Sequence, residues 1–262
     1  MKNKHLVILL SALSAGALGL QAQTAPAPAA PSSSWTLTTA FVSQYMFRGV
    51  RLGGFSFQPS VEYSSGPWVA GIWANKPISD KVPGVSDPEL DFYGSYTETV
   101  NDSLNFATGI TIYHYPHADK SQGFYEWTFE PNVTVNYTIA GFKLSPKVYV
   151  DTALNGPTAE FTAAYALPLK DMGTELDFTA TIGTYKWSKS AENASPDVKN
   201  YGNYWLVGVS APFQITPNSK LVLGMAYTEG YDNYLKTGSQ PKVKNSAAVH
   251  RGVASLSYSL SF

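Results

Sequence analysis

Cysteine is missing from this chain altogether. Without thiols there can be no disulfide framework and no lipid attached through an N-terminal cysteine. Long apolar runs are also missing, because beyond Leu20 no continuous stretch reaches the roughly 20 residues that a transmembrane helix needs. If the protein meets a membrane, its strands must do so.

Charge is scarce as well. Charged residues make up 14% of the chain, against about 25% in ordinary soluble domains. Aromatic residues make up another 14%, yet mean hydropathy is only -0.12. This combination is typical of a β-barrel that has one lipid-facing and one polar face. The formal net charge of -1 argues against a nucleic-acid partner, since such partners require a basic surface.

The N-terminus has the pattern of a secretory signal. Lys2 and Lys4 precede an apolar stretch that ends at Leu20, and small residues follow around Ala22. We therefore expect a signal peptide over residues 1–22. Residues 23–33 are rich in proline, alanine and serine and predict an extended periplasmic linker. The remaining residues, 34–262, form one predicted outer-membrane β-barrel.

Period-two alternation between turn residues predicts about 12 strands, each long enough to cross a bilayer when tilted. The expected spans are 34–48, 55–63, 67–75, 89–100, 103–115, 124–138, 141–152, 158–169, 174–187, 201–214, 219–231 and 247–262. The strand over 67–75 is apolar at both parities, so its orientation stays open. Connections alternate between short turns and longer polar segments, among them Gly49–Gly54. The fold class is therefore all-β, a transmembrane antiparallel β-barrel with short periplasmic turns and longer extracellular loops.

The last segment has the clearest alternation. Apolar side chains, ending with Tyr258, Leu260 and Phe262, share one face, and serines occupy most of the other. The segment resembles the C-terminal strand by which outer-membrane barrels are recognised for assembly. We therefore expect a bacterial outer-membrane location, contact with outer-membrane lipid and recognition by the barrel-assembly machinery.

Polar residues at the other strand parity should face the lumen, since a charge on the lipid face costs roughly 2–4 kcal/mol near the midplane. Pairing the strands over 124–138 and 141–152 places Glu130 near Lys147, and Arg48 could pair with Glu62 or set the charge preference of the mouth. The inward charges could line a pore or brace a filled lumen. The predicted pore-lining residues are Gln44, Arg48, Gln58, Glu62, Asp91, Glu126, Glu130, Lys143, Lys147, Asp151 and Asp177.

Four stretches carry a family resemblance. Phe41–Val50, Pro59–Tyr63, Gly71–Asn75 and Glu89–Gly94 resemble the TorF-type porins, a poorly characterised proteobacterial outer-membrane family. The motifs cover about the first third of the chain that follows the signal peptide. The resemblance implies an outer-membrane barrel with a porin-like role and names no ligand.

The resulting interpretation is a monomeric channel for passive diffusion of small hydrophilic solutes, with no cofactor, metal or covalent chemistry. The loops over 76–88, 186–200 and 232–246 would constrict its mouth.

One alternative is a lipid-modifying or hydrolytic barrel enzyme built on His114, whose parity points it to lipid. His117 and Asp119 suggest a weaker metal-site hypothesis. A third possibility is a structural or adhesive barrel without transport. Aromatic residues near strand ends, including Tyr45, Phe47 and Trp187, predict interfacial girdles.

Overall fold

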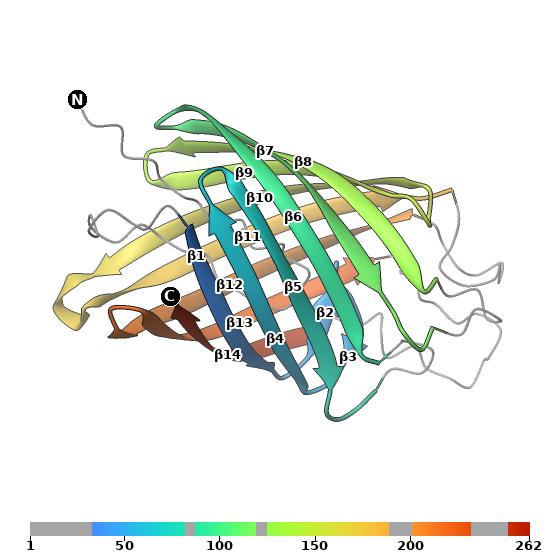
Figure 1. The fold of residues 1–262 in the computed structure, drawn as a ribbon, viewed down its shortest axis with the longest axis horizontal. Helices are drawn as coiled ribbons and strands as arrows, with labels where there is room; N and C mark the ends of the chain where they lie inside the picture. Colours follow the sequence, from blue (N-terminus) through green and yellow to red (C-terminus); the bar gives the residue numbers. More distant parts are fainter. Residues whose placement is uncertain (1–32, 82–86, 119–124, 189–200, 232–250) are drawn as a thin grey trace.

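The protein is a closed barrel of twelve antiparallel strands, as a computed structural model shows (Figure 1). The structure describes residues 33–81, 87–118, 125–188, 201–231 and 251–262. The wall strands are β1 (Ser33–Val42), β4 (Ser56–Ser65), β5 (Trp68–Pro77), β6 (Glu89–Asn101), β7 (Leu104–His114), β8 (Trp127–Ile139), β9 (Phe142–Asp151), β10 (Gly156–Leu169), β11 (Thr174–Lys186), β12 (Tyr201–Thr216), β13 (Ser219–Tyr231) and β14 (Arg251–Ser261). The predicted fold class is confirmed. The signal peptide expected over 1–22 and nearly all of the linker lie outside the described residues.

Each strand pairs with its sequence neighbour in the wall, and β1 closes the ring by pairing with β14. In this closure Thr36 lies opposite Ser261, and Thr38 lies opposite Ser259. One end of the barrel carries short connections, including the 3-10 turn η2 (Lys170–Met172) between β10 and β11. We call this the short-turn end, and the opposite end, where the longer connections lie, the long-loop end. Among the described residues no helix is long and apolar enough to cross a membrane.

The alternation seen in the sequence becomes an outward and an inward face. On β14, Leu256, Tyr258 and Leu260 are exposed on the outside of the ring, whereas Ser259 is buried inside it. The strand that the sequence left unoriented is β5. Its residues Val69, Gly71, Trp73 and Asn75 point inward, and Trp68, Ala70 and Ile72 point outward. An apolar exterior of this kind needs lipid or detergent as its solvent.

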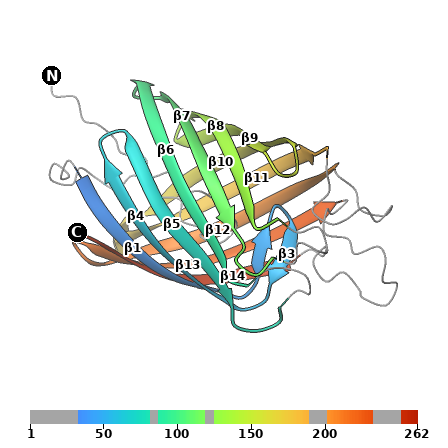
Figure 2. The same ribbon diagram turned by 45° about the vertical axis from the view of Figure 1, so that its right-hand side comes forward.

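One prediction was wrong and its correction defines the site. The first strand does not run from 34 to 48, because β1 ends at Val42 and Ser43 bonds to Ala254 on β14. The chain then turns inward and forms a separate hairpin, β2 (Tyr45–Phe47) and β3 (Val50–Gly53). Residues 49–54 are therefore no outer loop. Both ribbon views place the hairpin within the ring of strands, toward the end opposite the C-terminus (Figures 1 and 2).

The composition of the hairpin explains this position. Tyr45, Met46, Val50 and Leu52 bring apolar side chains to both faces of a short two-stranded ribbon, and all of them are buried. Most wall strands have one polar and one apolar face. This ribbon is apolar on both faces and buries both by packing inside the ring. A two-stranded ribbon alone is marginally stable in water, and packing inside the barrel supplies what it lacks.

Candidate functional site

The hairpin turns at Arg48 and Gly49, the two central residues between Phe47 and Val50. Their φ angles are 48° and 76°. Positive values at both central residues are what a type I′ turn requires. Glycine adopts this conformation freely, but a non-glycine residue there costs roughly 1–2 kcal/mol. Such strain persists only where tertiary contacts hold it, so the contacts of Arg48 are the first feature of the site.

Arg48 makes a bidentate ion pair with Glu130 on the facing wall. Its Nη1 and Nη2 atoms donate to Oε1 and Oε2 of Glu130 at 2.8 and 2.7 Å, and the hydroxyl of Tyr113 donates to Oε2 at 2.9 Å. The guanidinium also lies 4.6 Å from the ring centroids of Phe47 and Tyr149. Paired hydrogen bonds between a guanidinium and a carboxylate are among the strongest that side chains form. The hairpin tip is thus a cation fully matched by a buried carboxylate.

Two more contacts tie the hairpin to different strands. Gly49 lies so close to β13 that a Cβ atom on it would sit 2.6 Å from the Cα atom of Gly230. Tyr45 donates from its hydroxyl to Glu89 on β6 at 2.7 Å, and Tyr115 donates to the same carboxylate at 2.9 Å. Because β6, β8 and β13 lie at different positions around the ring, the hairpin crosses the lumen and does not pack along one wall only.

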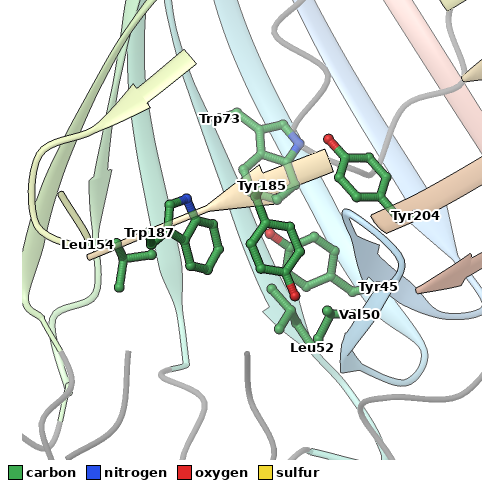
Figure 3. Packing of buried hydrophobic residues seen from close by; sticks show 8 residues of the cluster. All are labelled: Tyr45, Val50, Leu52, Trp73, Leu154, Tyr185, Trp187 and Tyr204. Atoms are coloured by element: carbon green, nitrogen blue, oxygen red, sulfur yellow. The ribbon is translucent and has the colours of Figure 1, made fainter. Parts of the chain in front are cut away.

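An aromatic cluster surrounds the hairpin. It consists of Tyr45, Val50, Leu52, Trp73, Leu154, Tyr185, Trp187 and Tyr204, all buried, and Figure 3 shows them gathered from hairpin and wall. The girdle prediction placed Tyr45, Phe47 and Trp187 at the lipid interface, and this was wrong, since Tyr45 and Trp187 are 1% and 2% exposed and Phe47 packs against the same cluster. The rings face inward because the hairpin supplies apolar surface there. The packed cluster lies in the long-loop half.

The short-turn half of the lumen has a different lining, in which hydroxyl side chains lie beside charged ones such as Glu62, the register partner of Thr36. Small hydroxyl side chains face each other across β1, β4 and β14, with hydrogen bonds of 3.0, 2.9 and 2.9 Å in the pairs Thr36–Ser261, Thr38–Ser259 and Ser34–Ser64. No described apolar ribbon enters this half. Between the two halves, a pocket on the inner wall is lined by Tyr93, Thr111, Thr134 and Lys147 among others.

The structure places the sequence-predicted residues as follows. Ten of them lie on the inward faces or in the hairpin region, and Glu126 lies half-buried just before β8. Whether any of them lines a conducting pore stays a prediction. The observed hydrogen bonds join Gln44 to Arg51, Gln58 to Asn75, Glu62 to Tyr93, and Asp151 to Thr128. Asp91 and Asp177 are buried. Lys143 and Lys147 are half-buried.

Two predicted pairings hold in part. Arg48 pairs with an inward carboxylate, as expected, but the hairpin carries it across the lumen to Glu130 and not to Glu62. Lys147 is near enough to Glu130 for their charges to interact, but its cross-strand neighbours are Thr134 on β8 and Glu160 on β10. Glu160 went unnoticed in the sequence, although it accepts hydrogen bonds from Tyr149 and from Tyr204, the latter at 2.7 Å.

Sequence signals for the missed hairpin did exist. The pair Arg48–Gly49, flanked by Phe47 and Val50, has the glycine at the second central position that a type I′ turn favours. The excess of apolar residues on both sides of this turn was the second signal.

His114 points outward, as its parity predicted. Its ring stacks on Trp127 with centroids 3.7 Å apart, and its Nδ1 atom lies 3.3 Å from the carbonyl oxygen of Glu126. Over the described ranges no three His, Cys, Asp or Glu side chains are placed to hold a metal ion, and Asp119 of the metal-site hypothesis lies outside those ranges. His114 is thus packed as an aromatic side chain at the edge of the wall.

Solved structures with a similar fold include outer-membrane porins. The NanC porin matches with a TM-score of 0.55 and 8% identity, over 86% of this chain and 98% of that one. The KdgM porin, solved in complex with disordered oligogalacturonate, gives 0.52 and 9%, over 87% and 99%. LpxR from Salmonella typhimurium gives 0.46 and 7%, over 86% and 99%. At these identities the likeness concerns the fold alone.

The comparisons by sequence give a family without an assigned activity. No curated protein matches the chain. The resemblance to TorF-type porins is supported in its coarser part, a porin-like barrel, and the finer name stays a prediction. A family profile does match residues 28–247, most of the chain. The protein therefore belongs to the Gcw_chp family, described as bacterial proteins of unknown function.

Proposed function

We propose that the protein is a channel of the bacterial outer membrane that passes small hydrophilic solutes by passive diffusion. The observation that carries the proposal is the closed twelve-stranded barrel with an apolar exterior and a polar interior. Its fold is shared with NanC and KdgM, which are both porins. Oligogalacturonate is a ligand of KdgM.

In the proposed channel the two halves of the lumen have different tasks. The long-loop end faces the exterior, and a solute entering there first meets the hairpin and the aromatic cluster. This segment is the constriction, because the hairpin contacts β6, β8 and β13 at once. The solute then crosses the hydroxyl-lined half toward the periplasm, where serine and threonine side chains can replace part of its hydration shell.

The proposal includes the surroundings of the barrel. The exposed apolar face of the wall lies against outer-membrane lipid, and the last strand, with Tyr258, Leu260 and Phe262, is recognised by the barrel-assembly machinery. We propose a monomer, and we propose that the loops over 76–88, 186–200 and 232–246 narrow the mouth further.

Ion pairs at one of these loops support that role. Lys76 and Lys81 bind the carboxylate of Asp87 at 2.9 and 2.5 Å and so join the described parts of the first loop, residues 76–81 and 87–88. Partial burial by itself would raise the pKa of Asp87, but hydrogen bonds from Lys81 and Lys76 outweigh it and lower that pKa. The carboxylate therefore stays charged at neutral pH, as the ion pairs require.

The test is single-channel recording from the refolded chain without residues 1–22 in a planar bilayer. Discrete conductance steps are the expected result. Folding and insertion are checked in parallel by resistance to unfolding in detergent and to protease in vesicles. Silence from protein that passes both checks would contradict the channel. The His114 hydrolase, tested on lipid substrates with His114→Ala, and a loop-mediated adhesin would then be the hypotheses to pursue.

A further inference from the structure

We propose that the pathway through this barrel selects cations over anions, an inference that rests on the proposed channel function. The selectivity of a channel follows from the charges that line its narrow part and from the net charge of its lumen. The arginine at the proposed constriction is Arg48.

Arg48 contributes almost no field to the lumen. Its guanidinium meets the Glu130 carboxylate through two hydrogen bonds, and the two side chains are 6% and 0% exposed. Paired charges at contact distance cancel each other at a distance. Arg51, the other arginine of the hairpin, donates from its Nη2 atom to Asp80 at the mouth, a carboxylate that is itself largely exposed. The hairpin thus enters the lumen with its positive charges neutralised.

The remaining inward charges of the described strands are mostly acidic. Carboxylates lie on β4, β6, β9, β10 and β11, namely Glu62, Glu89, Asp91, Asp151, Glu160, Glu175 and Asp177. The cationic groups on inward positions are Lys143, Lys147, Lys220 and Arg251. Carboxylates therefore outnumber cations along the path once the Arg48–Glu130 pair is set aside.

Two of the lysines lie among carboxylates. Lys147 is opposite Glu160 in the strand register, and its Nζ atom sits 4.4 Å from the ring centroid of Tyr149. Lys220 is attracted to both Asp177 and Glu175. An anion approaching either ammonium group would also meet these carboxylates, which weakens any anion site.

Two of the carboxylates have a buried oxygen without a hydrogen-bond partner among the described residues. They are Oε1 of Glu62 and Oδ1 of Asp177, and the two residues are only 7% and 2% exposed. The second oxygen of Glu62 accepts a hydrogen bond from Tyr93 at 2.9 Å, so the side chain is held in place. A buried carboxylate that lacks partners is costly unless a cation or a donor meets it. A cation in the lumen attracts such a carboxylate through space and thereby lowers the cost of its charge.

The primary experiment measures the reversal potential of the unmodified protein in a planar bilayer under a KCl gradient. We expect a K⁺ to Cl⁻ permeability ratio above one. A ratio at or below one, with clear conductance steps, would overturn the cation preference and leave the channel proposal standing. Silence from inserted barrels would overturn both.

A matched pair of variants locates the preference in the lumen. Glu62→Gln removes the charge and keeps an acceptor for Tyr93. We expect the permeability ratio to fall by roughly two- to fivefold, because a single charge acts on a passing ion through water, which weakens its field. Asp102→Asn, in the exposed turn after β6, makes the same change in charge outside the lumen and should leave the ratio unchanged. If Glu62→Gln and Asp102→Asn change the permeability ratio equally, the cation preference does not arise from the carboxylates of the lumen. Asp177→Asn serves as the second lumen variant if Glu62→Gln does not insert.

Discussion

The long-loop half of the barrel interior and the short-turn half are lined by different side chains. In the first, Arg48, Glu130 and a set of aromatic rings are packed against an inward hairpin, and most of these side chains are buried. In the second, small hydroxyls such as those of Thr38 and Ser259 line the wall and bond across it. The wall strands alternate with period two in both halves, so the difference between the halves comes from the hairpin and not from the wall.

The hairpin concentrates stabilising tertiary contacts in one half of the interior, where we also place the constriction of the proposed channel. A buried ion pair, a close backbone approach and a buried tyrosine hydrogen bond all hold it. Removing a partner from the ion pair or the hydrogen bond leaves a buried polar group unsatisfied. The hydroxyl pairs of the short-turn half leave no such group, since water can replace a serine or threonine partner. Substitutions in the long-loop half should therefore lower the free energy of unfolding more than substitutions in the short-turn half.

Glu130→Ala should have the largest effect. It leaves the guanidinium of Arg48 buried without its carboxylate, which costs about 3–5 kcal/mol in comparable pairs. We expect a lower free energy of unfolding in urea, measured by tryptophan fluorescence in lipid vesicles, together with a larger single-channel conductance as the hairpin loosens. The double variant Arg48→Met, Glu130→Leu is the control, and it should recover most of the stability. If Glu130→Ala is as stable as the parent protein, the Arg48–Glu130 ion pair does not hold the hairpin in place.

Gly49→Ala should come next. The new Cβ would lie 2.6 Å from the Cα atom of Gly230, and the residue would keep a φ of 76°. Overpacking of this kind costs about 1–3 kcal/mol, to which the left-handed backbone adds roughly 1–2 kcal/mol. Gly66→Ala is the matched control, because its φ is 55° and nothing lies within 4 Å of the added atom. Similar losses of unfolding free energy in the two variants would show that the close approach to β13 is unimportant.

Tyr45→Phe removes the hydroxyl that donates to Glu89 at 2.7 Å. We expect a loss of about 1 kcal/mol, since Tyr115 still satisfies the other oxygen of that carboxylate. Tyr96→Phe is the matched control, because it removes an exposed hydroxyl that donates to Glu98 at 2.7 Å. Its effect should be smaller, since water can take the place of the lost partner. Urea titrations of both variants measure the difference, and a larger loss for Tyr96→Phe would contradict the ranking.

Thr38→Val should have the smallest effect among the lumen variants. It removes one hydroxyl from the pair with Ser259 in the short-turn half, with a loss of about 0.5–1 kcal/mol. Conductance should stay at the parental value, because this half is not the constriction. A marked fall in conductance would move the narrow part of the channel away from the hairpin.

Much of the fold could be predicted from the sequence because the strands of a membrane barrel follow a simple alternation. The observed strands β6, β11 and β13 begin at the predicted residues, and the lipid-facing set of β14 is the predicted one. The strand ends were less well defined, since alternation fades where side chains leave the bilayer. β5 could not be oriented because its inward face also carries an apolar residue, Trp73, which packs on the hairpin.

The sequence predicted only part of the candidate site. The sequence by itself determined which wall residues share the polar parity, Glu62, Glu130 and Lys147 among them, because parity is a local property of a strand. Only the tertiary structure decided that Arg48 crosses the lumen to Glu130 and that Trp187 turns inward. Local pattern cannot report such contacts, since they depend on closure of the ring and on where the chain after Val42 finds apolar surface to bury.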